Sequence, residues 1–133
     1  MIAAALVAVS GCMHTGESAE VTEMTRSNAA SATADANNIS RETDPLARAA
    51  KCYVFLGASR NANSRGVGHD DVAMAQAQSQ WYLTLRGSLS QIEADQLVGS
   101  SVNMLVPAEA AARDAASRYC VENAPTVDPT PGS

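Results

Sequence analysis

The chain has 133 residues, of which 46% are hydrophobic and 4% aromatic, so a single small domain with a thin core is expected. Its net charge is −5, but residues 44–123 carry eight acids and seven bases, so most of the negative charge lies outside this range. This nearly neutral range has no basic stripe, which argues against nucleic-acid binding, and no polybasic cluster that would hold a protein on anionic lipid.

The chain begins with one apolar run, MIAAALVAV, in residues 1–9. A membrane-spanning helix needs about 20 apolar residues, so the run is too short to span and instead has the length of a signal-peptide hydrophobic segment. Signal peptides open with positive residues, but no Lys or Arg precedes Arg26. We therefore expect the true start of the protein to lie upstream.

The stretch Val9-Ser10-Gly11-Cys12 resembles the lipobox of bacterial lipoproteins, in which an aliphatic residue and two small ones precede an obligatory cysteine. The resemblance implies that residues 1–11 are removed as a signal peptide and that Cys12 carries acyl chains, palmitate among them, which anchor the protein to a membrane. Two or three chains hold far more tightly than one. By the enteric sorting rule, Met13 in place of Asp implies the outer membrane, with the domain facing the periplasm. No domain family is recognised in the rest of the chain.

Residues 12–43 are predicted to form a lipid-anchored flexible tether, because their polar, aliphatic-poor composition cannot offset the entropy lost on ordering. The alanine-rich range 28–36 is expected to be transiently helical. Residues 124–133 contain three prolines and are predicted to be a disordered tail. The folded domain is therefore placed at residues 44–123.

Two helices are expected in the first half of this domain. Asp44 as N-cap and Pro45 at the first helical position mark the start of one that fades near Ser59. The other runs from about residue 71 to Arg86 and is ended by Gly87, since glycine favours a helix end. Their core faces are expected to contain Leu46, Ala49, Tyr53 and Leu56 in the first helix and Met74, Ala77, Trp81 and Leu85 in the second.

Two further helices follow. Ser90 and Glu93 have the spacing of a capping box and predict a third helix that continues to Leu105. Pro107 interrupts the chain before an alanine-rich fourth helix over residues 108–121. Sustained period-2 alternation is absent, so we predict an all-α fold, a small up-and-down bundle of four short helices behind the tether.

Once Cys12 is assigned to lipid, Cys52 and Cys120 remain. Compartments beyond the inner membrane are oxidising, so a disulfide between these two residues is predicted to join the first helix to the fourth. The alternative is a pair of buried free thiols that act as small apolar fillers.

The sequence offers little to support catalysis. His14 lies beside the lipidation site, and His69 precedes Asp70 and Asp71, which are better explained as helix-capping residues than as metal ligands. The motifs of zinc proteases, serine hydrolases and nucleotide-binding loops are absent. We therefore predict no catalytic residue, no metal and no cofactor.

Tyr82 and Arg86 lie one helical turn apart, and they are the residues singled out as a possible partner surface. The leading interpretation is a lipid-anchored helical module of the cell envelope with a non-enzymatic binding or structural role. One alternative is an inhibitor or immunity lipoprotein that caps a toxin or a lytic enzyme. Another is a carrier with a small-ligand pocket between helices.

Overall fold

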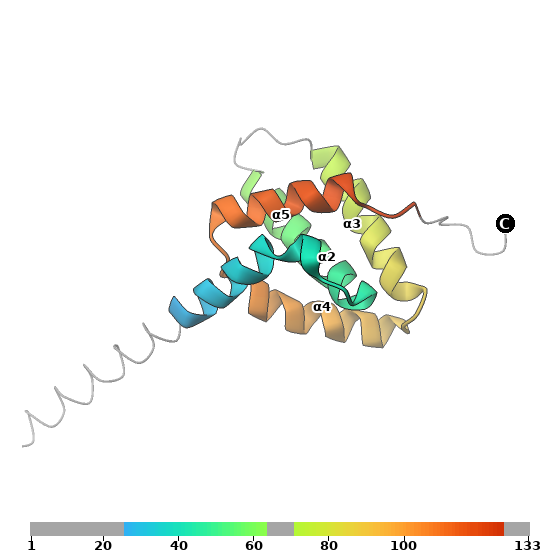
Figure 1. The fold of residues 1–133 in the computed structure, drawn as a ribbon. Coiled ribbons are helices and arrows are strands. Elements are labelled where there is room, and N and C mark those ends of the chain that lie inside the picture. Colours follow the sequence, from blue (N-terminus) through green and yellow to red (C-terminus); the bar gives the residue numbers. More distant parts are fainter. Residues whose placement is uncertain (1–25, 64–70, 127–133) are drawn as a thin grey trace, which may run out of the picture.

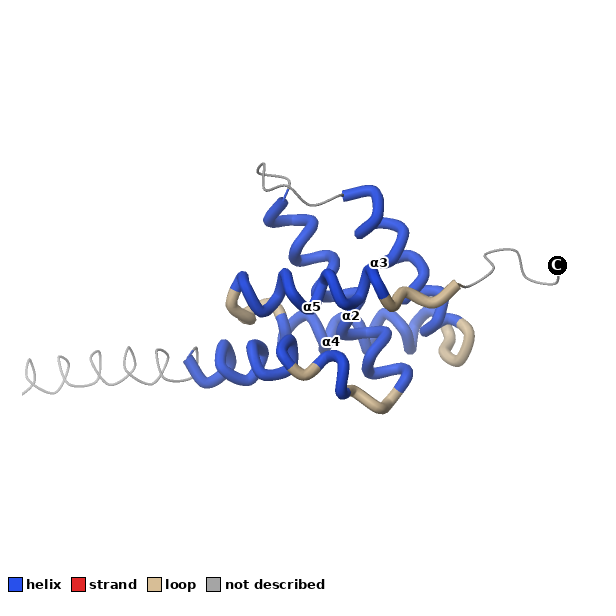
Figure 2. Tube along the Cα trace, turned by 45° about the horizontal axis from the view of Figure 1, so that its top comes forward, coloured by secondary structure: helices blue, strands red, loops and turns tan. Residues whose placement is uncertain are grey.

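The helix α2 (Pro45–Asn63) lies at the centre of the fold, which we describe from a computed structural model over residues 26–63 and 71–126 (Figure 1). A helical segment over residues 26–37 and a 3-10 turn, η1 (Ile39–Arg41), precede it. The helices α3 (Asp71–Arg86), α4 (Gln91–Leu105) and α5 (Ala110–Glu122) follow and all pack on α2. Every regular element within these ranges is helical, which confirms the predicted all-α bundle (Figure 2).

Local sequence sets the start of α2 as predicted. The side chain of Asp44 accepts a 3.0 Å hydrogen bond from the backbone N–H of Leu46, and Pro45 occupies the first helical position. The expected core stripe was too narrow, however, since Cys52, Val54 and Phe55 are buried together with Ala49 and Leu56. Neighbours on several sides of α2 bury more than one face of it, and an amphipathic pattern does not anticipate this.

The helices α3 and α4 follow their sequence signals closely. All four residues predicted for the inner face of α3 are buried: Met74, Ala77, Trp81 and Leu85. At the start of α4 the Ser90 hydroxyl accepts from the Glu93 backbone N–H at 3.1 Å, and the Glu93 carboxylate accepts from the Ser90 N–H at the same distance. The predicted capping box is therefore confirmed.

Residues 26–43 do not form the flexible tether that their composition predicted. Ala32, Ala36 and Ile39 are buried in the main core. The Thr33 hydroxyl accepts a 3.0 Å hydrogen bond from the backbone N–H of Glu109, and the Lys51 ammonium lies 3.7 Å from Asp35. The boundary placed at residue 44 is thus corrected, because the packed unit includes residues 26–43.

The reason for this error is chemical. Alanine adds little to hydropathy, but its small side chain lets a helix approach its neighbour closely, so an alanine-rich segment can pack without a conventional apolar stripe. Residues 1–25, which include the predicted signal peptide and the start of the tether, lie outside the described residues. Residues 127–133 of the predicted tail lie outside them as well, while Ala124 still packs against the core.

A disulfide between Cys52 and Cys120 joins α2 to α5, as predicted, with a Cα–Cα distance of 5.5 Å. Both cysteines are fully buried. The indole N–H of Trp81, from α3, donates to the backbone carbonyl of Cys120. The covalent bond and this hydrogen bond therefore bring three helices together at one point of the core.

Candidate partner-binding site

Tyr82 joins α3 to α4 at the protein surface. Its hydroxyl donates a 2.7 Å hydrogen bond to a carboxylate oxygen of Asp95, and its ring centroid lies 5.6 Å from that of Tyr53 on α2 at an interplanar angle of 47°. Tilted aromatic pairs at this separation attract each other beyond the effect of area burial. Both tyrosines are half-buried, so each ring has one face supported by protein and another part open to solvent.

The surroundings of Tyr82 favour its neutral form. The hydrogen bond to Asp95 raises the pKa of the Tyr82 phenol above its ordinary value, because ionisation would remove the donated proton, and desolvation acts in the same direction. The Arg86 guanidinium lies close enough to oppose this shift. The two residues singled out in the sequence are therefore neighbours in the structure, with Arg86 exposed.

Gln78 on α3 forms two hydrogen bonds to α2 beside Tyr82. Its side-chain amide donates to the backbone carbonyl of Tyr53 at 3.2 Å and accepts from the Arg60 guanidinium at 2.7 Å. Arg60 also pairs with Asp71 at 3.0 Å. Gly57 leaves the space for this arrangement, since a Cβ there would lie 2.8 Å from the Gln78 side-chain nitrogen.

These side chains line two neighbouring hollows that share lining residues. The larger, of about 450 Å³, lies between α2 and α3, and the smaller, of about 200 Å³, continues toward the last turn of α4. Tyr53 and Gln78 line both hollows. We call this combined surface the tyrosine groove, and its principal residues are Tyr53, Gly57, Arg60, Gln78, Ser79, Tyr82, Val102 and Val106.

Sequence reasoning found part of this groove. Tyr82 was singled out together with Arg86, one helical turn away. Tyr53 was assigned to the core, and Asp95 was not singled out. Gln78 and Val102 carried no signal that pointed to a site, because the rotation of α4 against α2 decides which residues face the groove.

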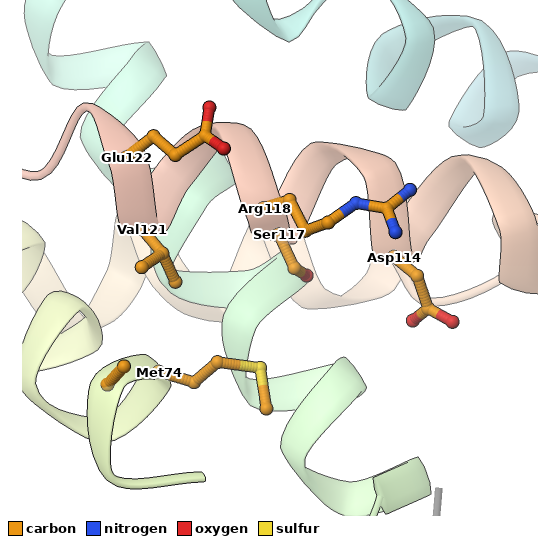
Figure 3. A pocket seen from close by; sticks show the side chains of 7 residues that line it. Met74, Asp114, Ser117, Arg118, Val121 and Glu122 are labelled. Carbon is orange, nitrogen blue, oxygen red and sulfur yellow. The ribbon is translucent and has the colours of Figure 1, made fainter. Parts of the chain in front are cut away.

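A second, smaller pocket lies between α3 and α5. It has a volume of about 140 Å³ and is mainly apolar. Figure 3 shows Val121 and Ser117 pointing from α5 toward Met74 on α3, whereas Glu122 points away from α3. Arg118, which is exposed, lies at the edge of this pocket.

Polar groups satisfy one another beside this pocket. The Ser117 hydroxyl donates to the backbone carbonyl of Phe55 at 2.9 Å and lies 2.6 Å from the Ser59 hydroxyl. Ser59 in turn donates to a carboxylate oxygen of Asp114 at 2.9 Å. The described residues place no histidine beside either serine, and we assign this network to helix packing.

The remaining sequence expectations concern residues that the structure does not cover. The proposed lipidation residue Cys12 and both histidines, His14 and His69, lie outside the described residues. Within the described ranges, no three or more His, Cys, Asp or Glu side chains gather as metal ligands. None of the helices in those ranges has the length and apolar character that crossing a membrane requires.

Comparisons with protein-family models, with curated proteins and with solved structures found no match to this chain.

Proposed function

We propose that the protein is a lipid-anchored module of a bacterial cell envelope that binds another protein through the tyrosine groove. The lipobox at Val9–Cys12 supports the anchor, and Met13 in place of Asp favours an outer-membrane location facing the periplasm. The buried Cys52–Cys120 disulfide is in keeping with an oxidising compartment. The Ser59 hydroxyl beside Asp114 is fully buried and is not open to a substrate, so the proposed role is non-enzymatic.

The tyrosine groove is the observation that carries the binding role. Protein interfaces are enriched in Tyr and Arg, whose large side chains make many contacts, and the groove presents two tyrosines beside Arg60 and Arg86. Hydrogen bonds already fix Tyr82 and Gln78, so a partner would lose less side-chain entropy on binding there.

Site-specific photo-crosslinking of the full-length protein in living cells tests this proposal. A photoreactive residue at Ser79, which is exposed and lines the groove, should capture one envelope protein. The same residue at Ala115, which is exposed on α5 and lines no part of the groove, is the matched control. Capture from Ser79 should fall when Gly57→Leu displaces Gln78 and fills the groove.

The outcomes separate the candidate roles. Identical capture from Ser79 and Ala115, or none from either, would contradict a binding role for the groove. If the captured protein is a toxin or a lytic enzyme whose activity falls on binding, the inhibitor alternative replaces the recruiting one. Separately, Cys12→Ala should abolish lipid labelling and membrane attachment, and membrane attachment that persists would contradict the anchor.

The apolar pocket beside Met74 favours a second candidate, the binding of a small apolar ligand. A volume of about 140 Å³ suits a small hydrophobic group and not a whole lipid chain. A hydrophobic fluorescent dye should bind the purified protein, and Val121→Trp, which fills the pocket, should abolish the binding. Equal dye binding by both proteins would exclude this site.

A further inference from the structure

We propose that the α4–α5 end of the domain, which we define as residues 101–112, lies against the lipid surface to which Cys12 is anchored. This inference rests on the proposed lipid anchor and adds an orientation to it. It assigns one occupant, a phospholipid bilayer, to an exposed apolar surface.

The α4–α5 end carries little charge and exposes apolar side chains. Its twelve residues include one charged side chain, that of Glu109. Met104 is 61% exposed and Val106 is 52% exposed, and the exposed Ala110 and Ala111 lie nearby in the chain. Exposed apolar side chains that gather in this way mark a contact surface more often than scattered ones do.

The other end of the same helix has a different character. Residues 86–96, around the α3–α4 turn, include three charged side chains in eleven positions: Arg86, Glu93 and Asp95. The apolar Ile92 is isolated among them, although it is 72% exposed. The two ends of α4 therefore differ in charge, and only one of them is suited to contact with lipid.

The described chain begins on the apolar side. The N-terminal segment, residues 26–37, runs past the α4–α5 turn, where the Glu109 backbone N–H donates to Thr33. In Figure 1 the blue start of this segment and the orange turn between α4 and α5 lie at the same end of the molecule, and Figure 2 agrees. The first described residues therefore lie at the apolar end, whereas α4 begins at the opposite end.

The reach of the chain makes this contact possible. From Cys12 to Arg26 there are 14 residue steps, which span at most about 50 Å even when fully extended. A weak contact with a surface held this close is populated far more than the same contact in free solution. Arg26 is exposed and is the only charged residue in 26–34, so lipid phosphates would offer it a partner.

The test uses the full-length lipidated protein in vesicles of phosphatidylethanolamine and phosphatidylglycerol with brominated acyl chains. Bromine quenches tryptophan only at short range. Met104→Trp reports on the proposed contact, and Ile92→Trp is the matched control at the other end of α4. Trp81 stays in both variants as a shared, buried reference. The quantity compared is the fluorescence of the introduced tryptophan, above that of Trp81. In Met104→Trp we expect it to fall by about half, as for a residue a few ångströms below the lipid surface. In Ile92→Trp we expect it to be unchanged.

The results also distinguish the orientation from the anchor. Equal quenching of the two variants in vesicle-bound protein would overturn the orientation while leaving the anchor intact. Protein that fails to stay with the vesicles would instead contradict the anchor. Hydrogen exchange on the unsubstituted lipoprotein provides a readout without a mutation, since residues 101–112 should exchange more slowly in vesicles than in the soluble Cys12→Ala protein. If that protection also occurs without lipid but rises with protein concentration, a second copy covers this end and the proposal is wrong.

Discussion

Trp81 donates a 2.9 Å hydrogen bond from its indole nitrogen to the backbone carbonyl of Cys120, one of the two disulfide-bonded residues. Because both groups are buried, the carbonyl has no water to replace this donor. The largest side chain of the core is thereby fixed beside the only disulfide in the described ranges.

Trp81→Phe should therefore lower the free energy of unfolding by about 2 kcal/mol, since it leaves the Cys120 carbonyl unsatisfied and opens a small cavity. Denaturant titration followed by circular dichroism measures the change. Tyr119→Phe removes a hydroxyl from a half-buried side chain on α5 and serves as the control, with an expected change below about 0.5 kcal/mol. Equal effects of the two substitutions would show that the indole hydrogen bond contributes little.

Removal of the disulfide should cost more. Cys52 and Cys120 are 68 residues apart, and closing a loop of that length stabilises the folded state by about 4 kcal/mol through the lower entropy of the unfolded chain. The double variant Cys52→Ala/Cys120→Ala should unfold at correspondingly lower urea concentration. Reductant should shift the unsubstituted protein to a similar midpoint and leave the double variant unchanged. A reductant effect on the double variant would point to another cause.

The packing of the N-terminal segment can be tested with two neighbouring alanines. Ala32 is 0% exposed and Ala34 is exposed on the same helical segment. Ala32→Lys should lower the free energy of unfolding by about 2–3 kcal/mol, because the long charged side chain has no room and no solvent there. Ala34→Lys should change it by less than about 0.5 kcal/mol. Two small and equal effects would restore the interpretation of residues 26–43 as a flexible tether.

The Tyr82–Asp95 hydrogen bond predicts a pH effect on the alkaline side. Because the folded state raises the pKa of Tyr82 above its unfolded value of 10.0, the associated stability is fully present below that value. It is lost as the pH rises through the folded pKa. Ultraviolet titration of the unsubstituted protein, with Tyr82→Phe subtracted, should give a raised pKa that falls in Asp95→Ala. The control Gln96→Ala, at an exposed position beside Asp95, should leave it unchanged.

Much of the fold was predictable because its signals are local. The Asp44–Pro45 start of α2, the Ser90–Glu93 capping box and the apolar spacing of α3 each depend on residues close together in sequence. The disulfide followed by elimination, once Cys12 was assigned to lipid. Such features need no knowledge of how the helices pack.

The tyrosine groove and the packed N-terminal segment depend on packing between distant residues. Tyr53 and Tyr82 meet only because of the relative rotation of α2 and α3, and Asp95 reaches Tyr82 across the α3–α4 turn. Thr33 and Glu109 are 76 residues apart in the chain. The composition of the segment also did not predict the burial of Ala32 and Ala36. Small side chains bury little area, but they permit close contact between helices.

The position of the disulfide also determines how the domain would carry mechanical force. Cys52 lies on α2 and Cys120 near the end of α5, so the covalent link bypasses α3, α4 and most of α5. A pull between the N-terminal segment and the C-terminal end passes through this link and cannot extend the 68-residue loop, whose unravelled length would be about 230 Å. A pull on α3 or α4 has no such bypass. A load applied to the α3 or α4 side of the tyrosine groove would therefore strain those two helices, while α2 and α5 remain linked.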